Sequence, residues 1–160
     1  MELRGINHLA LVAKDMDATV RFYTQVLNMR LVRAGRNDDD PDSRHYFFDM
    51  GGGNLLAFFD FPGLEGKGVL GIGSMHHLSF TVGSLEELME ARERLISQGV
   101  HVSGLVDHDF IKSIYFRDPN GILLEISAYT RPLSQADLLA DPEPVPAVLG
   151  LMEQAGRKPS

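Results

Sequence analysis

An internal repeat constrains the fold of this chain more than any other feature of its sequence. The segment "NHLALVAKDMDATVRFYTQVLNMRLVR", residues 7 to 33, aligns without a gap with "HHLSFTVGSLEELMEARERLISQGVHV", residues 76 to 102. Both segments begin with the alternation of a half-buried strand and continue with the apolar spacing of a helix. Farther along, "HYFFDMGGGNLLAFF" and "IYFRDPNGILLEIS" are both typical of strand, tight turn and strand. Each copy is therefore predicted to be a β-α-β-β-β module.

One such module cannot cover both faces of its sheet, so the two modules are expected to pair. We predict an α+β fold: two paired βαβββ modules that form a cup-shaped mixed sheet with the helices outside. The predicted divisions are a single domain over residues 1–130, made of module one at about 5–60, a glycine-rich linker at 61–75 and module two at about 76–130, and a tail at 131–160. The tail contains a proline-rich hinge, "DPEPVPA", and a short helix is expected over residues 148 to 155.

The composition narrows the range of partners. A net charge of -7 opposes contact with a phosphate backbone, so no nucleic-acid partner is expected. Apolar runs such as "LLAFF" are too short to cross a bilayer, and the first residues lack the apolar core of a signal peptide. The absence of cysteine excludes disulfides and thiolate metal sites. We therefore expect a cytoplasmic protein with a small-molecule substrate and no membrane partner, in which His, Asp or Glu would hold any metal.

Three side chains that bind metals are predicted to share one face. His8 and His77 occupy equivalent places in the repeat, opposite the large apolar residues that should lie under the helices, whereas His76 falls on the apolar side. Glu125 interrupts the apolar run of the last strand and is expected to face the same way as His8 and His77. A buried lone carboxylate is costly, and a divalent cation would account for it and for two imidazoles. We predict a 2-His-1-carboxylate site that leaves positions open for substrate, water or oxygen.

A simpler interpretation exists for each histidine alone. A histidine at the start of a strand is commonly a surface residue, or a buried one with ordinary hydrogen bonds. The repeat favours the metal site, because two histidines at equivalent positions together with a misplaced glutamate would be a rare coincidence.

The modules, with "NHLAL", "HHLSF" and "YFRDPNGILLEI", resemble the vicinal oxygen chelate superfamily over roughly residues 5 to 130. That superfamily includes glyoxalase I, extradiol ring-cleavage dioxygenases, fosfomycin-resistance transferases, methylmalonyl-CoA epimerase and metal-free bleomycin-binding proteins. The resemblance implies a metal-binding cup and a homodimer. Enzymes like glyoxalase I carry a fourth ligand, which corresponds here to Ala57 and is therefore missing. The three-ligand set His8, His77 and Glu125 is instead similar to that of the extradiol dioxygenases and the fosfomycin-type transferases.

The stretch "HDFIKSIYFRDPNGILLEI", residues 108 to 126, is similar to the signature of extradiol dioxygenases. The resemblance implies Fe(II) as the metal, with Mn, Zn, Ni or Co as alternatives, and a small catechol-like substrate. It gives Tyr115 and His108 catalytic roles as hydrogen-bond donors to bound substrate or oxygen. The simpler alternatives are that Tyr115, which has a counterpart in Tyr46, only packs on its strand, and that His108 is a solvated loop residue.

The sequence also departs from the extradiol pattern. Extradiol enzymes carry an acid-base histidine whose place here is close to Asn54, and only His45, on the preceding predicted strand, could substitute for it. Three functions stay open. The leading one is an Fe(II) extradiol-type dioxygenase, an oxidoreductase; the second is a glyoxalase-like lyase or isomerase, or a fosfomycin-type transferase, that uses a divalent metal; the third is a non-catalytic small-molecule binding protein. The sequence does not decide whether two chains exchange modules.

Overall fold

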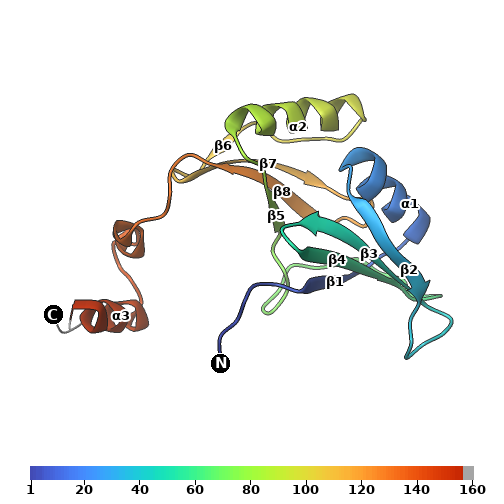
Figure 1. Ribbon diagram of the computed structural model, residues 1–160, viewed down its shortest axis with the longest axis horizontal. Helices are drawn as coiled ribbons and strands as arrows, with labels where there is room; N and C mark the ends of the chain where they lie inside the picture. The colour runs from blue at the N-terminus through green and yellow to red at the C-terminus, as the bar shows by residue number, and fades with distance from the viewer. Residues whose placement is uncertain (157–160) are drawn as a thin grey trace.

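The computed structural model describes residues 1–156, and its strands form two separate four-stranded sheets (Figure 1). The first sheet has the order β1-β4-β3-β2 and consists of β1 (His8–Val12), β2 (Arg30–Arg36), β3 (Arg44–Gly51) and β4 (Asn54–Asp60). The second has the order β5-β8-β7-β6 and consists of β5 (Leu78–Thr81), β6 (Val106–Asp107), β7 (Ile111–Arg117) and β8 (Leu123–Tyr129). In each sheet the first strand runs parallel to the last, and the other pairs are antiparallel. The predicted α+β fold of two repeated modules is confirmed.

The helices begin and end where local sequence signals place them. The elements are α1 (Met16–Arg21), which continues into the π-helical turn η1 (Phe22–Val26), and α2 (Leu85–Ser97). Asp15 caps α1 by accepting a hydrogen bond from the Ala18 amide at 3.0 Å, and Ser84 caps α2 through the Glu87 amide at 3.1 Å. Gly99, with φ of +78°, ends α2 because that left-handed conformation favours glycine.

The helix-bearing sides of both modules contribute to one core. Phe48, Phe58 and Leu124 are fully buried in the same apolar cluster, although they belong to different sheets. The ring of Phe22 in η1 packs against that of Phe116 in β7, with centroids 6.4 Å apart. Because neighbouring strand residues alternate in direction, the opposite faces of both sheets point away from this shared core.

The turn between β7 and β8 fastens the second module to the first. The Asn120 side chain accepts a hydrogen bond from the Lys14 amide at 2.8 Å and donates one to Thr19 Oγ1 at 3.0 Å. The Tyr23 hydroxyl donates to Asp118 Oδ2 at 3.2 Å. The predicted Asp-Pro-Asn-Gly turn is thus also a joint between the modules.

The two sheets are not closed into one. Within residues 1–156, no strand of one sheet pairs with a strand of the other, and β1 and β5 each lie at a sheet edge. Edge strands have unsatisfied backbone groups that readily pair with another chain. On β1, the alternate residues His8, Ala10 and Val12 are exposed.

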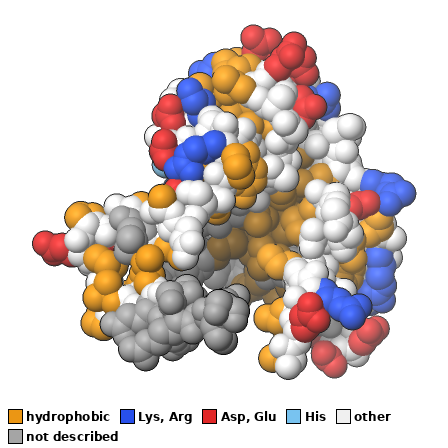
Figure 2. All heavy atoms as spheres, turned by 60° about the vertical axis from the view of Figure 1, so that its left-hand side comes forward, with side chains coloured by type: hydrophobic (Ala, Val, Ile, Leu, Met, Phe, Trp, Pro, Cys, Tyr) orange, Lys and Arg blue, Asp and Glu red, His pale blue; other side chains and the backbone are white. Residues whose placement is uncertain are grey.

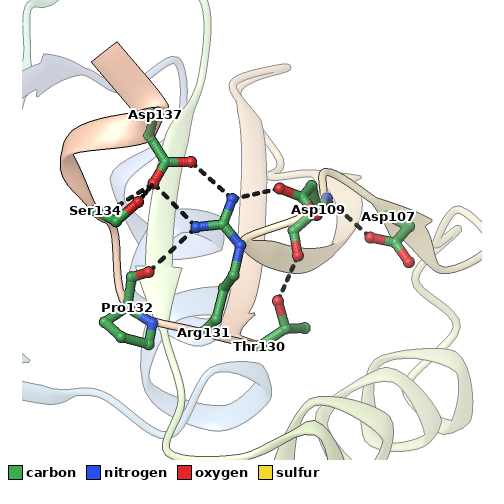
Figure 3. A network of polar contacts seen from close by, with 7 residues as sticks. All are labelled: Asp107, Asp109, Thr130, Arg131, Pro132, Ser134 and Asp137. Atoms are coloured by element: carbon green, nitrogen blue, oxygen red, sulfur yellow. Dashed lines mark hydrogen bonds and ion pairs between the residues drawn. The ribbon is translucent and has the colours of Figure 1, made fainter. Parts of the chain in front are cut away.

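Residues beyond the second sheet form an arm. It contains the 3-10 turn η2 (Gln135–Leu139) and the helix α3 (Pro146–Gly156), which lies away from the sheets (Figure 1). Arg131 anchors the arm, because its guanidinium pairs with Asp137 at 2.7 Å and also with Asp109 in the turn before β7 (Figure 3). The short helix expected over residues 148 to 155 lies within α3.

One face of the molecule is hollowed at its centre (Figure 2). Hydrophobic side chains gather at the centre of this face, and charged side chains lie mostly around its rim (Figure 2). None of the helices within residues 1–156 has the length and apolar character that crossing a membrane requires.

Candidate metal centre

Glu125 is a buried carboxylate with an unsatisfied oxygen. It lies in the middle of β8, where its neighbours are Ser79 of β5 and Tyr115 of β7, and it is 2% exposed. Its Oε2 lies 2.9 Å from His77 Nε2. Its Oε1 is buried without a hydrogen-bond partner among the described residues. An unpaired buried carboxylate oxygen destabilises the fold, so binding of a cation or a hydrogen-bond donor at Oε1 would be favourable.

His77 lies between the Glu125 carboxylate and solvent. Its side chain is 32% exposed, and its Nδ1 lies 2.6 Å from His76 Nδ1. A partner on one ring nitrogen orients the other, as in many metal sites. His76, which the sequence assigns to the apolar side of the strand, thereby helps to direct His77 Nε2 toward Glu125.

Tyr115 and His108 lie beside the same carboxylate. The Tyr115 hydroxyl is 2.9 Å from His108 Nε2, and the Tyr115 ring is perpendicular to that of His77 with centroids 5.8 Å apart. Partial burial and the negative charge of Glu125 raise the pKa of Tyr115 above its usual value. Tyr115 therefore remains a hydrogen-bond donor at neutral pH, and exposed His108 links it to solvent.

A row of hydroxyl groups extends from Glu125, and the sequence did not single out these serines as part of a site. Ser127 follows Glu125 on the same face of β8, and its Oγ lies 3.1 Å from Ser79 Oγ. Ser113 pairs with Ser127 across β7 and β8, and its Oγ is buried without a partner in the described chain. Alternation along three strands could have predicted the row, but serine alone is too common a residue to indicate a site.

His8 does not join this group within one chain. It lies on β1 of the first sheet, with Nδ1 2.7 Å from the Asn7 side-chain oxygen. Among the side chains that the structure describes, no three of His, Asp or Glu come close enough together to hold one ion. The structure therefore brings His77, Glu125, Tyr115 and His108 together and leaves His8 on the other sheet.

The face around His8 is aromatic. The His45 ring stacks on Phe59 with centroids 3.7 Å apart, and Phe47 lies between His45 and His8. Partial burial, with a smaller contribution from the positive charge of Arg33, lowers the pKa of His45. Because Phe47 contacts both rings, His45 lies on the same face as His8. The sequence suggested His45 as a substitute for the acid-base histidine of extradiol enzymes.

The donor set near Glu125 fits a divalent cation. One carboxylate and one imidazole with a 2.9 Å separation match two neighbouring ligands of a single ion, because ligand atoms each about 2.1 Å from a metal lie about 3 Å apart. The strand register confirms that Ala57 occupies the place of Glu125 in the first module, because Ala57 pairs with Ala10 as Glu125 pairs with Ser79. Each chain thus presents one half with the carboxylate of Glu125 and one half that carries His8 but no equivalent of Glu125.

The relatives of this chain agree with the fold. MhqA of Bacillus subtilis (strain 168), which bears the provisional name of a ring-cleaving dioxygenase, is 44% identical over 131 residues; these cover 80% of this chain and 41% of MhqA. The chain spans only 33 to 41% of the length of three such curated relatives.

Two solved structures show the same architecture. A glyoxylase/bleomycin resistance protein/dioxygenase domain from Frankia sp. EAN1pec superimposes with a TM-score of 0.69 at 27% identity, covering 80% of this chain and 99% of that one. The fosfomycin resistance protein FosX of Listeria monocytogenes, complexed with Mn(II) and sulfate, gives 0.60 at 25% identity, covering 81% and 95%. The model of the Glyoxalase/Bleomycin resistance protein/Dioxygenase superfamily matches residues 5–126, and the chain belongs to that superfamily.

Proposed function

We propose that this protein is a divalent-metal enzyme, an Fe(II) extradiol-type dioxygenase that acts on a small catechol-like substrate. The observation that carries the proposal is buried Glu125, with one oxygen beside His77 and the other without a partner. The ring-cleaving names of its relatives support the reaction class. Iron bound there would provide one centre for the catechol oxygens and for dioxygen.

The protein side chains would supply proton handling and orientation. The Tyr115 hydroxyl, already within 2.9 Å of His108, can donate a hydrogen bond to a substrate oxygen. His108, at the surface, can pass a proton between Tyr115 and solvent. The serine row offers further donors and acceptors next to the carboxylate.

The proposal includes a homodimer in which His8 of one copy completes the site of the other. His8 lies on a different sheet from Glu125, and β1 and β5 each have one edge without a partner strand in the described part of the chain. Large apolar side chains are also exposed, including Val12 on β1, Leu70 and Ile72 in the linker, and Leu149 in α3. Surfaces of this kind commonly contact another chain.

Metal analysis and oxygen uptake test the function directly. Protein reconstituted with Fe(II) without oxygen should bind about one ion per chain and then consume oxygen with members of a catechol panel, giving a yellow ring-fission product. Glu125→Ala and His8→Ala should each lose the metal while the circular dichroism spectrum persists, and His101→Ala, at an exposed position, should load normally. Fully loaded Glu125→Ala would refute the ligand assignment.

The other functions predict different results. A lyase, isomerase or fosfomycin-type transferase would bind metal but never consume oxygen, and the Mn(II) in the FosX structure favours including Mn(II) in the test. A non-catalytic binding protein would retain no metal at all.

Mixing two inactive variants tests whether the site is shared. His8→Ala retains His77 and Glu125, whereas Glu125→Ala retains His8. After the two are refolded together, each mixed dimer would contain one intact site, so about a quarter of wild-type metal should return. No recovery, with dimers present, would mean that each chain builds its own site.

A further inference from the structure

The turn between β7 and β8 contains the only Asn-Gly pair in the chain, Asn120-Gly121. Glycine has no side chain to shield its backbone nitrogen, so this nitrogen can approach the preceding asparagine side chain closely. Attack by the Gly121 nitrogen on Asn120 Cγ closes a cyclic succinimide and expels ammonia. Water then opens the ring and leaves aspartate or isoaspartate, so a neutral amide becomes a carboxylate. Water is the only co-reactant that this deamidation needs.

The folded turn is open to water but holds both reacting groups in other bonds. Gly121 is exposed, and its amide donates a hydrogen bond to the Asp118 carbonyl at 3.0 Å. Asn120 Nδ2 donates to Asp118 Oδ2 at 2.8 Å and to Thr19 Oγ1 at 3.0 Å. Asn120 Oδ1 accepts from the Lys14 amide at 2.8 Å. Rotation of this side chain toward the Gly121 nitrogen would break these bonds, so the closed turn protects Asn120.

Two of the three bonds of the Asn120 side chain cross the joint between the modules. Lys14 and fully buried Thr19 belong to the first module, whereas Asn120 belongs to the second. The hydrogen bond from Tyr23 to Asp118, at 3.2 Å, closes the same joint beside them. The Asn120 side chain is therefore released when the modules separate here, which is a local opening of the fold.

The product of deamidation does not fit the closed joint. It replaces Asn120 Nδ2 with a carboxylate oxygen, at a position 2.8 Å from the buried carboxylate of Asp118. Two like charges at this separation repel, and Thr19 Oγ1 loses the donor that it had. Isoaspartate also lengthens the backbone of a tight turn by one methylene group. A joint that has reacted once therefore closes less favourably than before.

We propose that Asn120 is a deamidation site gated by the joint between the modules. The closed joint protects the side chain, and each opening exposes it to an irreversible reaction that weakens the joint further. This inference is independent of the metal centre and of the proposed reaction. It makes the chemical ageing of this protein depend on how often its two modules separate.

Mass spectrometry of the peptide that contains Asn120 tests this on the full chain, incubated at mildly alkaline pH. Folded wild-type protein should deamidate at least about 100-fold more slowly than protein in concentrated urea, because the reaction follows the population of the open joint. Tyr23→Phe keeps every bond of Asn120 and weakens the joint, so it should accelerate the folded-state reaction about 5- to 30-fold. Thr19→Val, which removes one acceptor of the Asn120 amide, should also accelerate it. Tyr129→Phe is the matched control and should react as slowly as wild type.

Each contrary result overturns a stated part of the inference. Equal rates in folded protein and in urea would mean that the joint gives no protection, and no reaction in urea would remove the site. Unchanged rates in both Tyr23→Phe and Thr19→Val would refute gating by the joint.

Asn120→Asp has the sequence of the aspartate product and tests its effect on the joint. Its equilibrium constant for folding, measured by urea denaturation, should be about ten-fold lower than that of wild type. A variant as stable as wild type would refute the claim that deamidation weakens the joint.

Discussion

The Tyr23 hydroxyl, in the first module, donates a hydrogen bond to Asp118 Oδ2 in the second, and both side chains are buried. Asp118 also accepts from the Asn120 side-chain amide at 2.8 Å and from the amides of Asn120 and Ile122. Burial and the neighbouring Asp118 raise the pKa of Tyr23 well above its usual value, so Tyr23 stays the donor. This bond spans 95 residues of sequence and joins the two modules.

Tyr23→Phe should weaken that joint without opening a cavity. We expect the free energy of unfolding to fall by about 1–2 kcal/mol, because Asp118 loses one donor and keeps three. Urea denaturation followed by circular dichroism measures the loss. Tyr129→Phe, on an exposed tyrosine, is the control and should be neutral; equal stability of both variants would contradict the assigned role of the bond.

Glu125→Gln should separate stability from function. In metal-free protein the variant should be at least as stable as wild type, since the charged, unpaired Oε1 is replaced by a neutral amide. Wild-type protein should gain about 3–4 kcal/mol from Fe(II) at roughly a hundred to a thousand times its Kd, and the variant should gain none. Thermal melts with and without metal give both numbers. A destabilised metal-free variant would show that Glu125 already serves the fold.

Tyr115→Phe tests the donor beside the carboxylate. The substitution should leave the metal content unchanged and lower kcat by about a hundred-fold, because the hydroxyl that can exchange protons with substrate is lost. Oxygen uptake by protein of verified iron content measures kcat. An unchanged kcat would leave Tyr115 as a strand-packing residue, the simpler alternative for this position.

The arm should detach in acid. The bonds from Arg131 and the Ser134 amide lower the pKa of Asp137, so their stabilisation is present above the ordinary Asp value of 3.8 and is lost as pH falls toward the lower folded-state pKa. Hydrogen exchange of η2 amides should therefore rise below about pH 4, while amides of the sheets stay protected. Arg131→Gln should show the rapid exchange at pH 7, and Arg117→Gln should not.

The repeat predicted most of the fold because its signals are local. Strand alternation, the caps Asp15 and Ser84, and the stop at Gly99 depend on neighbouring residues alone. Glu125 could be recognised because a charged side chain within an apolar strand is unusual and indicates a functional role. The cross-strand pair of Tyr115 and Glu125 followed from the turn between their strands.

Features that depend on tertiary packing could not be read in the same way. The hydrogen bond between Tyr23 and Asp118 can be predicted only when the contact between the modules is known. The sequence of the turn already accounts for an aspartate at position 118, so nothing there indicated a second role. The stacking of the His45 ring on Phe59 likewise depends on which strands lie side by side. Nothing local to His8 indicates that it lies on a separate sheet from Glu125 and apart from His77.

If the proposed shared site forms, the placement of His8 and Glu125 on separate sheets would couple association of two chains to retention of the metal. An ion bound by His8 of one copy and by His77 and Glu125 of the other would also hold the two molecules together. Dilution and chelation then become two routes to the same loss, and the amount of active enzyme would vary with protein concentration as well as with iron supply.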